Sequence, residues 1–431
     1  MKQQFSGKGF RQKARLSAVL GAFSSLNLVL GFGLQAFIFY RIGVGERTDA
    51  LFAGMVVPQF VLTIVTLSLQ YVFIPLFSVQ KSDRFRRLGW SAFVGLVVLF
   101  GSASLILALA APLWVPLLLA GFSEEAKLMT VTLTRIQLVS VVFSGVNALL
   151  WAANRSRDRF VHVEGARMFA LASAFVLLAL FLTPTGAVFA AWVLVLREAI
   201  QTVLLLPVLG KPVKPDFKDE IFHTARKRIV PLLVGNSYTK TDAMLDKFLI
   251  SFGAVGQLSI LHFAQLVMNS AAQVVMSALI VPIAPDLSRH YAEGDLARFK
   301  RRMRSRMLGV ILVVLGGFGL FILVGHPLLY LLPKISHIRL ESIDPLYHTL
   351  LWLFGLPIGA VVGQLLVNSF YATGDTRTPV RLGAITYTLS IPVRFGLFHL
   401  YGLTGLVAAI SLHYLVSSVV LFTVARRRSY I

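Results

Sequence analysis

Cysteine is absent from the 431 residues, and acidic residues are scarce, with 19 Asp and Glu against 41 Lys and Arg. The absence of cysteine excludes disulfide bonds, thiolate metal sites and cysteine nucleophiles. Charged residues make up 14% of the chain, whereas soluble proteins carry about 25%. With 56% apolar residues and a mean hydropathy of +0.77, the composition indicates an integral membrane protein.

Apolar stretches that are long enough to cross a hydrocarbon core of about 30 Å as helices recur along the whole chain. The first stretch is too long for a signal-peptide core, and we expect it to be retained. The sequence therefore predicts an all-α integral membrane protein with about twelve transmembrane helices. The predicted spans are Ser17–Tyr40, Ala50–Ser78, Leu88–Leu118, Leu128–Trp151, Val161–Leu182, Ala187–Leu209, Ile229–Phe252, Gln257–Pro285, Met307–Leu332, Leu346–Tyr371, Leu382–Leu400 and Leu403–Val424.

Basic residues cluster in alternate loops between these spans. Such an asymmetry marks the cytoplasmic side of a membrane protein, so we expect both termini to be cytoplasmic. The net charge of +22 then reflects topology and attraction to anionic membrane lipids, rather than nucleic-acid binding. The predicted cytoplasmic clusters include Arg84, Arg86 and Arg87; Arg155, Arg157 and Arg159; 298–306; and 426–428.

The two halves of the chain resemble each other weakly. Phe52-Ala53 corresponds to Phe263-Ala264, and Pro112-Leu113 corresponds at nearly the same spacing to Pro327-Leu328. Six helices in each half predict two six-helix bundles related by a parallel pseudo-twofold repeat, with a cleft between them for alternating access. The predicted segments are a basic tail (1–16), the first bundle (17–209), a linker (210–228), the second bundle (229–424) and a basic tail (425–431).

Ordered motifs resemble the MurJ (MviN) branch of the MOP (multidrug/oligosaccharidyl-lipid/polysaccharide) flippase superfamily. They are Tyr40-Arg41-Ile42-Gly43 with Asp49, Asp246-Lys247-Phe248 with Ala264, Phe370-Tyr371-Ala372 with Thr378-Pro379-Val380, and Gly402–Leu406. The resemblance implies an alternating-access flippase that moves a polyprenyl-(pyro)phosphate-linked saccharide to the outer leaflet. The saccharide is either a lipid II-like peptidoglycan precursor or a polysaccharide or O-antigen unit. The oligomeric state stays open.

The span Ile229–Phe252 holds an unusual number of ionisable residues. Lys240, Asp242, Asp246 and Lys247 fall within eight positions, although each charge costs about 2.5–3.5 kcal/mol at the membrane centre. Helical spacing puts the two lysines on one face and the two aspartates on another. We expect this part of the span to line a cavity that meets an anionic headgroup. The alternative is ion pairing between helices.

Other polar residues are weaker candidates. Arg41 and Asp49 bracket the first external turn, where they bind substrate, gate transport or anchor the hairpin. Gln35, Gln265 and Asn269 occupy plausible cavity positions, but hydrogen bonds between helices explain them equally well. Arg135, Arg167 with Glu164, and Arg197 with Glu198 are interpreted as interfacial or structural.

Arg394 lies in the middle of a predicted span. The resemblance aligns it with a place where sodium-binding members carry Asn or Asp. Because a guanidinium stays charged in a protein, it requires a carboxylate partner when buried. The resemblance also implies that this span touches the span Ile229–Phe252, so we predict an ion pair with Asp246 or Asp242 and transport that is independent of sodium. The alternative is that Arg394 extends toward the outer interface near His399.

Two other functions compete with a flippase. A cation-coupled multidrug exporter of the same superfamily would carry a carboxylate-led site. A membrane saccharide polymerase or ligase would require a large external loop, and the loops between the predicted spans are short. Because no nucleotide-binding, metal-binding or hydrolase motif is present in the sequence, we expect a transporter rather than an enzyme, without a cofactor.

Overall fold

The computed structural model describes residues 7–280, 283–331 and 340–428, and this part of the chain contains helices and no strands. The all-α prediction is confirmed. Residues 1–6 and 429–431 of the two predicted tails lie outside the described part. The chain groups into two compact units. Unit 1 comprises Met1–Ile38, Ala50–Leu118 and Ser123–Met244, and unit 2 comprises Phe39–Asp49, Leu119–Phe122 and Leu245–Ile431. The predicted segment boundaries and the pseudo-twofold repeat stay predictions.

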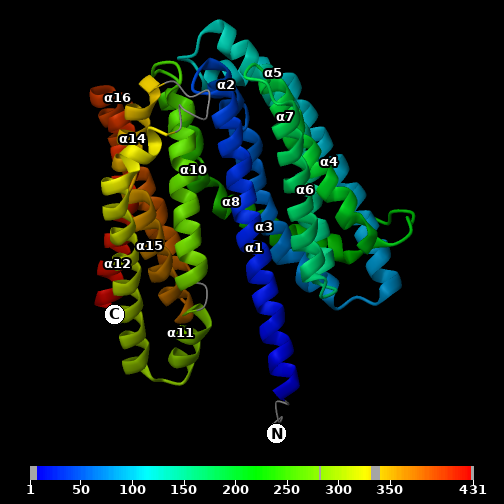
Figure 1. Cartoon of the computed structure of the whole chain (residues 1–431). Helices are drawn as coiled ribbons and strands as arrows, with labels where there is room; N and C mark the ends of the chain where they lie inside the picture. Colours follow the sequence, from blue (N-terminus) through cyan, green and yellow to red (C-terminus); the bar gives the residue numbers. More distant parts are fainter. Residues whose placement is uncertain (1–6, 281–282, 332–339, 429–431) are drawn as a thin grey trace. The chain divides into compact units, whose positions relative to one another are not determined.

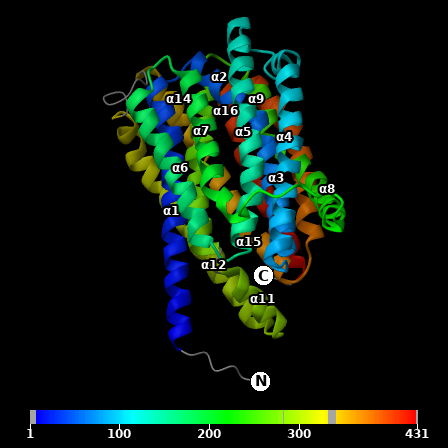
Figure 2. The same cartoon turned by 90° about the vertical axis from the view of Figure 1, so that its right-hand side faces the viewer.

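Unit 1 is a bundle built around α5, which packs against α3, α4 and α7 (Figure 2). The start of α5 is capped by Ser123, whose hydroxyl accepts a hydrogen bond from the Ala126 amide at 3.1 Å. This cap satisfies an amide that has no partner within the helix. The elements up to the linker are α1 (Gly7–Ile42), α2 (Glu46–Gly54), α3 (Val56–Ser78), α4 (Ser82–Leu118), α5 (Glu124–Arg155), α6 (Phe160–Phe181), α7 (Ala187–Leu205), the 3-10 turn η1 (Leu206–Leu209) and α8 (Glu220–Lys240).

Unit 2 is centred on α15, which packs against α10, α12 and α16 (Figure 1). Close approach of α15 to α16 depends on Gly359, because a Cβ atom there would lie 2.4 Å from the Tyr414 carbonyl. The remaining elements are α9 (Asp242–Ile250), α10 (Gln257–Val275), the π turn η2 (Met276–Ile280), α11 (Ile283–Ala292), α12 (Leu296–Leu329), the 3-10 turn η3 (Leu340–Ser342), α14 (Ile343–Trp352), α15 (Gly355–Ala372) and α16 (Arg377–Arg427).

Ten helical stretches in the described part are long and apolar enough to cross a membrane. One of them, α16, contains two of the predicted spans. Gly402, with a φ of 59°, interrupts the helix between these two spans. A further predicted span, Ile229–Phe252, is divided into α8 and α9 and does not enter the ten. Counting α16 twice and adding the divided span recovers the predicted number of about twelve.

The outward faces of the long helices are apolar. On α4 and α12, large aliphatic side chains are exposed over several turns, as expected for helices in contact with lipid rather than water. They include Val98, Leu105, Leu109, Leu113 and Leu117 on α4, and Leu308, Leu312, Leu320 and Leu323 on α12. The chain is a multi-pass membrane protein.

Candidate functional site

A polar cavity lies inside unit 1, among α1, α3, α5, α6 and α7. Its wide part has a volume of about 260 Å³ and its narrow part about 70 Å³, and both parts are lined by Leu62, Ser144 and Glu198. The wide part is also lined by Thr66, Gln70, Asn147, Ala148, Trp151, Arg167 and Gln201, and the narrow part by Gln35, Met55, Pro58, Gln59, Gln137, Ser140, Leu194 and Arg197. Converging amides, hydroxyls and charges inside an apolar bundle are typical of a binding site.

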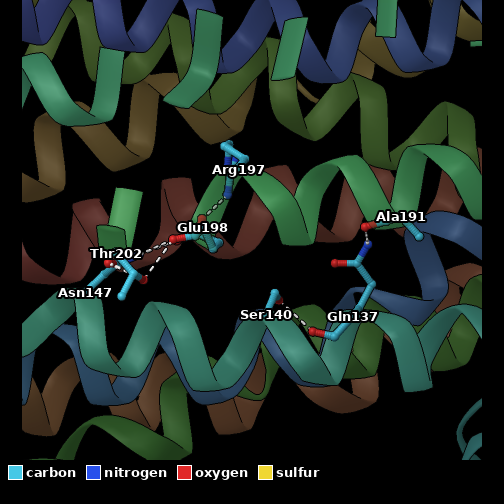
Figure 3. A network of polar contacts seen from close by, with 7 residues as sticks. All are labelled: Gln137, Ser140, Asn147, Ala191, Arg197, Glu198 and Thr202. Carbon is cyan, nitrogen blue, oxygen red and sulfur yellow. Dashed lines mark hydrogen bonds and ion pairs between the residues drawn. The ribbon is translucent and has the colours of Figure 1, made fainter. Parts of the chain in front are cut away.

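Glu198 of α7 is held in place by a network of polar contacts (Figure 3). The side chain of Asn147 on α5 donates a hydrogen bond from Nδ2 to a carboxylate oxygen of Glu198 at 3.1 Å. The Thr202 hydroxyl donates to Asn147 Oδ1 at 2.9 Å and thereby orients the amide. Arg197 forms an ion pair with the same carboxylate. Glu198 is therefore held in a fixed orientation beside the guanidinium of Arg197.

Arg167 of α6 gives the cavity an excess of positive charge. Arg155 pairs with Glu164 and Arg197 pairs with Glu198, whereas Arg167 has no carboxylate partner within the described residues. Its guanidinium lies 5.9 Å from the ring centroid of Trp151, which also lines the cavity. The cavity lining therefore presents two guanidinium groups and one carboxylate.

A second group of charges is sealed inside unit 2. The Arg394 guanidinium donates a hydrogen bond from Nη1 to Asp246 Oδ1 at 2.7 Å, and Gln265 donates from Nε2 to Asp246 Oδ2 at 3.0 Å. The Arg394 side chain is 0% exposed and that of Asp246 is 4% exposed. This contact agrees with the pairing expected from the sequence and joins α9, α10 and α16. Its role in transport stays a prediction.

Asp49 and Lys247 lie in the same unit and are both buried. Asp49 accepts hydrogen bonds from the amides of Gly256 and Ser259 at 2.6 Å and 2.7 Å, and so caps the start of α10. This geometry favours an anchoring role for Asp49. The Lys247 side chain lies near enough to Asp49 and Asp246 to interact with both charges. Its Nζ atom has no hydrogen-bond partner among the described residues.

Most of the predicted substrate-binding residues lie outside the unit 1 cavity, and three of them, Asp49, Lys247 and Gln265, lie near one another in unit 2. Within the described lining, the cavity includes Gln35 but none of the other seven, which are Arg41, Asp49, Lys240, Asp242, Lys247, Gln265 and Asn269. Lys240 ends α8 and Asp242 begins α9, whereas Asn269 is exposed on α10.

The helical face expected to join Lys240 and Lys247 is not continuous. Hydrogen bonds from the Thr241 amide to Tyr238 and from the Met244 amide to Thr241 span three residues instead of four, which breaks the helix between α8 and α9. Lys240 is exposed whereas Lys247 is buried.

Arg167 and the Arg197–Glu198 pair were predicted to be interfacial or structural, and in the structure they also line the polar cavity. The available signal was an Arg-Glu pair in the middle of the apolar span Ala187–Leu209. Among the described residues, no group of three or more His, Asp or Glu side chains is arranged to hold a metal ion.

Comparisons with known proteins match nearly the whole chain. The family model described as "Lipid II flippase MurJ" covers residues 38–431. A relative named "Lipid II flippase MurJ" from Burkholderia cenocepacia is 21% identical, over 96% of this chain and 84% of its own. A "Probable lipid II flippase MurJ" from Haemophilus influenzae is 28% identical, over 43% of this chain. That match spans only 39% of the relative's length.

Solved structures show the same fold. The structure titled "Lipid II flippase MurJ, inward closed conformation" superposes with a TM-score of 0.79 at 15% identity, over 96% of this chain and 89% of that chain. An inward-facing MATE family multidrug resistance transporter gives a TM-score of 0.65 at 15% identity, over 93% and 94%. This chain therefore shares its fold with these two membrane transporters.

Within that class, the family model decides the assignment. The chain belongs to the lipid II flippase MurJ family, as the motifs around Asp49, Asp246 and Pro379 predicted.

Proposed function

We propose that this chain moves a polyprenyl-(pyro)phosphate-linked saccharide from the inner to the outer leaflet by alternating access. The observation that supports this most is the polar cavity of unit 1, which lies inside a bundle with an apolar outer surface. A lipid-linked saccharide requires such a polar environment for its headgroup while its tail stays in the bilayer. Family membership and the names of the relatives favour a lipid II-like saccharide.

The charge of the cavity favours this function over multidrug export. An exporter of cationic drugs requires a carboxylate that is free to attract its substrate. Here Glu198 is paired with Arg197, and Arg167 adds a second guanidinium. The excess positive charge suits a phosphate-linked headgroup. A membrane potential that is negative inside favours outward movement of such an anion by about 2.3 kcal/mol per charge per 100 mV.

A reconstituted assay tests the proposal. Purified protein in vesicles is expected to move a fluorescent lipid-linked saccharide between leaflets faster than vesicles without protein. Export of a cationic dye without any saccharide movement would instead support the multidrug exporter. Complementation of a bacterial strain that lacks its own lipid II flippase then tests whether the saccharide is a peptidoglycan precursor.

The orientation is a further part of the proposal. The clusters of basic residues support cytoplasmic termini and cytoplasmic linkers in a bacterial inner membrane. Reporter fusions are expected to indicate the cytoplasm at every one of five positions, and an external signal at two of them would contradict the orientation. The five fusion positions follow Arg87, Arg159, Arg228, Arg306 and Arg428.

The start of α12 supports a contact with anionic membrane lipids. Phe299 and Met303 are buried at 1% and 0% exposure, so one face of this segment packs onto unit 2. The opposite face carries Arg301 and Arg304, which are both exposed. Such a cationic face attracts anionic lipid headgroups. Anionic vesicles are expected to stabilise the protein more than zwitterionic ones, and the doubly substituted variant R301E/R304E is expected to lose that difference.

A further inference from the structure

We propose that the wide part of the unit 1 cavity is a subsite for one pyranose ring of the transported saccharide, with Glu198 as the residue that recognises the sugar hydroxyls. The inference rests on the proposed flippase function. It concerns where the sugar binds and how much of the sugar is recognised.

The wide part of the cavity has room for one sugar ring. A volume of about 260 Å³ corresponds to roughly nine water molecules at about 30 Å³ each. One six-membered sugar ring with its hydroxyl groups occupies a similar space. This part of the cavity is not fully enclosed, so the remainder of a larger headgroup can extend beyond it.

The chemistry of the lining matches a sugar better than an apolar ligand or a simple anion. Each sugar hydroxyl both donates and accepts hydrogen bonds, and so do the amides of Gln70 and Gln201. The Trp151 ring lies in the same lining and provides an apolar surface for the C–H groups of a pyranose. An apolar ligand would leave these amides without partners, and an isolated phosphate has no C–H face to place against Trp151.

Glu198 is prepared for this role before any ligand binds. Asn147 and Arg197 hold its carboxylate in place, so binding a sugar requires little further ordering. Glu198 lines both parts of the cavity, and its side chain is 14% exposed. A carboxylate oxygen that is fixed in this way accepts hydrogen bonds from sugar hydroxyls more strongly than a neutral group does.

The same unit contains a matched carboxylate, Glu164, that is not part of the described lining of this cavity. Glu164 of α6 accepts hydrogen bonds from Asn27 Nδ2 at its carbonyl oxygen (3.1 Å) and at its carboxylate (3.0 Å), as Glu198 does from Asn147 at 3.1 Å and 3.1 Å. Glu164 also pairs with an arginine, Arg155, at 3.3 Å. The described lining of either part of the cavity does not include Glu164. The two sites therefore separate a structural carboxylate from one that is available to a ligand.

Two lipids that differ only in the sugar test the inference. The full chain, purified in nanodiscs, is measured for its affinity toward polyprenyl diphosphate carrying one hexose and toward polyprenyl diphosphate alone. Glu198→Gln is expected to weaken binding of the hexose-bearing lipid by at least about tenfold, the loss expected for a hydrogen bond to a charged group. Binding of the sugar-free lipid is expected to change little. Glu164→Gln is expected to leave both affinities unchanged.

A second variant tests the same subsite in case Glu198→Gln does not fold. Gln201→Leu keeps a similar volume and leaves the Asn147–Glu198–Arg197 contacts intact, and it is expected to weaken only the hexose-bearing lipid, by about three- to tenfold. Equal affinity of wild type, Glu198→Gln and Gln201→Leu for the hexose-bearing lipid would overturn the sugar subsite while leaving the flippase proposal standing. Failure of the wild-type protein to bind either lipid would overturn both.

Discussion

The charges of unit 1 and the charges of unit 2 are made of the same residue types but differ in what surrounds them. In unit 1, Arg197 and Glu198 line a cavity, and Arg167 adds a guanidinium with no carboxylate partner among the described residues. In unit 2, Arg394 and Asp246 are sealed, with 0% and 4% of their side chains exposed. Arg197 and Glu198 are paired with each other but line a cavity that a ligand can enter, whereas the Arg394–Asp246 pair is buried beyond the reach of a ligand. Exposure to a cavity, rather than the presence of a charge, separates binding residues from structural ones.

The largest expected change in stability follows from removing the buried ion pair between Arg394 and Asp246. Arg394→Ala strands the Asp246 carboxylate in an apolar interior, which typically costs about 3–5 kcal/mol of unfolding free energy. We expect the variant to melt at a much lower temperature in detergent or to be degraded in cells. Adding Asp246→Asn removes the stranded charge and is expected to restore part of the stability.

Arg381→Ala is the control for this prediction. Arg381 lies on the same helix, α16, but its side chain is exposed, so its loss is expected to cost less than about 0.5 kcal/mol. Equal melting temperatures for the Arg394→Ala and Arg381→Ala variants would show that the sealed pair does not stabilise unit 2.

A smaller effect is expected at Asp49. Asp49→Ala removes the acceptor for the Gly256 and Ser259 amides, and losing a helix cap costs about 1–2 kcal/mol. Hydrogen exchange is expected to accelerate at the first amides of α10 and to change little elsewhere. If Asp49→Ala instead abolishes transport while α10 exchanges as slowly as in wild type, Asp49 acts on the substrate or on gating, and the anchoring role is wrong.

A pair between Arg394 and either Asp246 or Asp242 could be predicted from the rule that a buried guanidinium requires a carboxylate, together with the family resemblance, which implied that the two helices touch. A guanidinium within an apolar span cannot lose its proton, so a carboxylate on a neighbouring helix must be its partner. The helical content, the membrane class and the interruption at Gly402 also follow from hydropathy and from residue types with narrow conformational preferences. Family motifs such as Asp246-Lys247-Phe248 supplied the remaining information about the fold.

The cavity could not be predicted in the same way. Glu164 and Glu198 look alike in the sequence, because each lies in an apolar helix that also carries an arginine. Each also accepts hydrogen bonds from an asparagine on another helix. Only packing decides that one of them faces open space. The prediction that Lys240 and Lys247 share one helical face was wrong for a related reason. Helical spacing assumes an unbroken helix, and two three-residue hydrogen bonds at Thr241 interrupt it.

A carboxylate outside both groups gives a smaller, pH-dependent effect. Hydrogen bonds from Thr378, followed by the charge of Arg428, lower the pKa of Asp375 at the start of α16. A lowered pKa stabilises the folded state fully above the unfolded-state value of about 3.9, and this contribution disappears as the pH falls through the folded-state pKa. We expect Asp375→Asn to flatten the decline in melting temperature below about pH 4. If the melting temperature of Asp375→Asn falls with pH as steeply as that of the wild type, the decline is caused by other carboxylates.

The smallest expected effect is the response to sodium, which we predict to be absent. A sodium ion requires several oxygen ligands, and at Asp246 each carboxylate oxygen already accepts a hydrogen bond, from Arg394 or Gln265. A cation beside this carboxylate would also be repelled by the guanidinium, which no solvent screens at 0% exposure. Vesicles that contain the protein are therefore expected to transport equally fast in sodium and in potassium at the same membrane potential. Collapsing the potential is expected to slow both by the same factor, because the charge of the substrate is unchanged. Transport that requires sodium would show that the ion binds elsewhere or displaces Arg394, and the Arg394–Asp246 pair would then not explain the coupling.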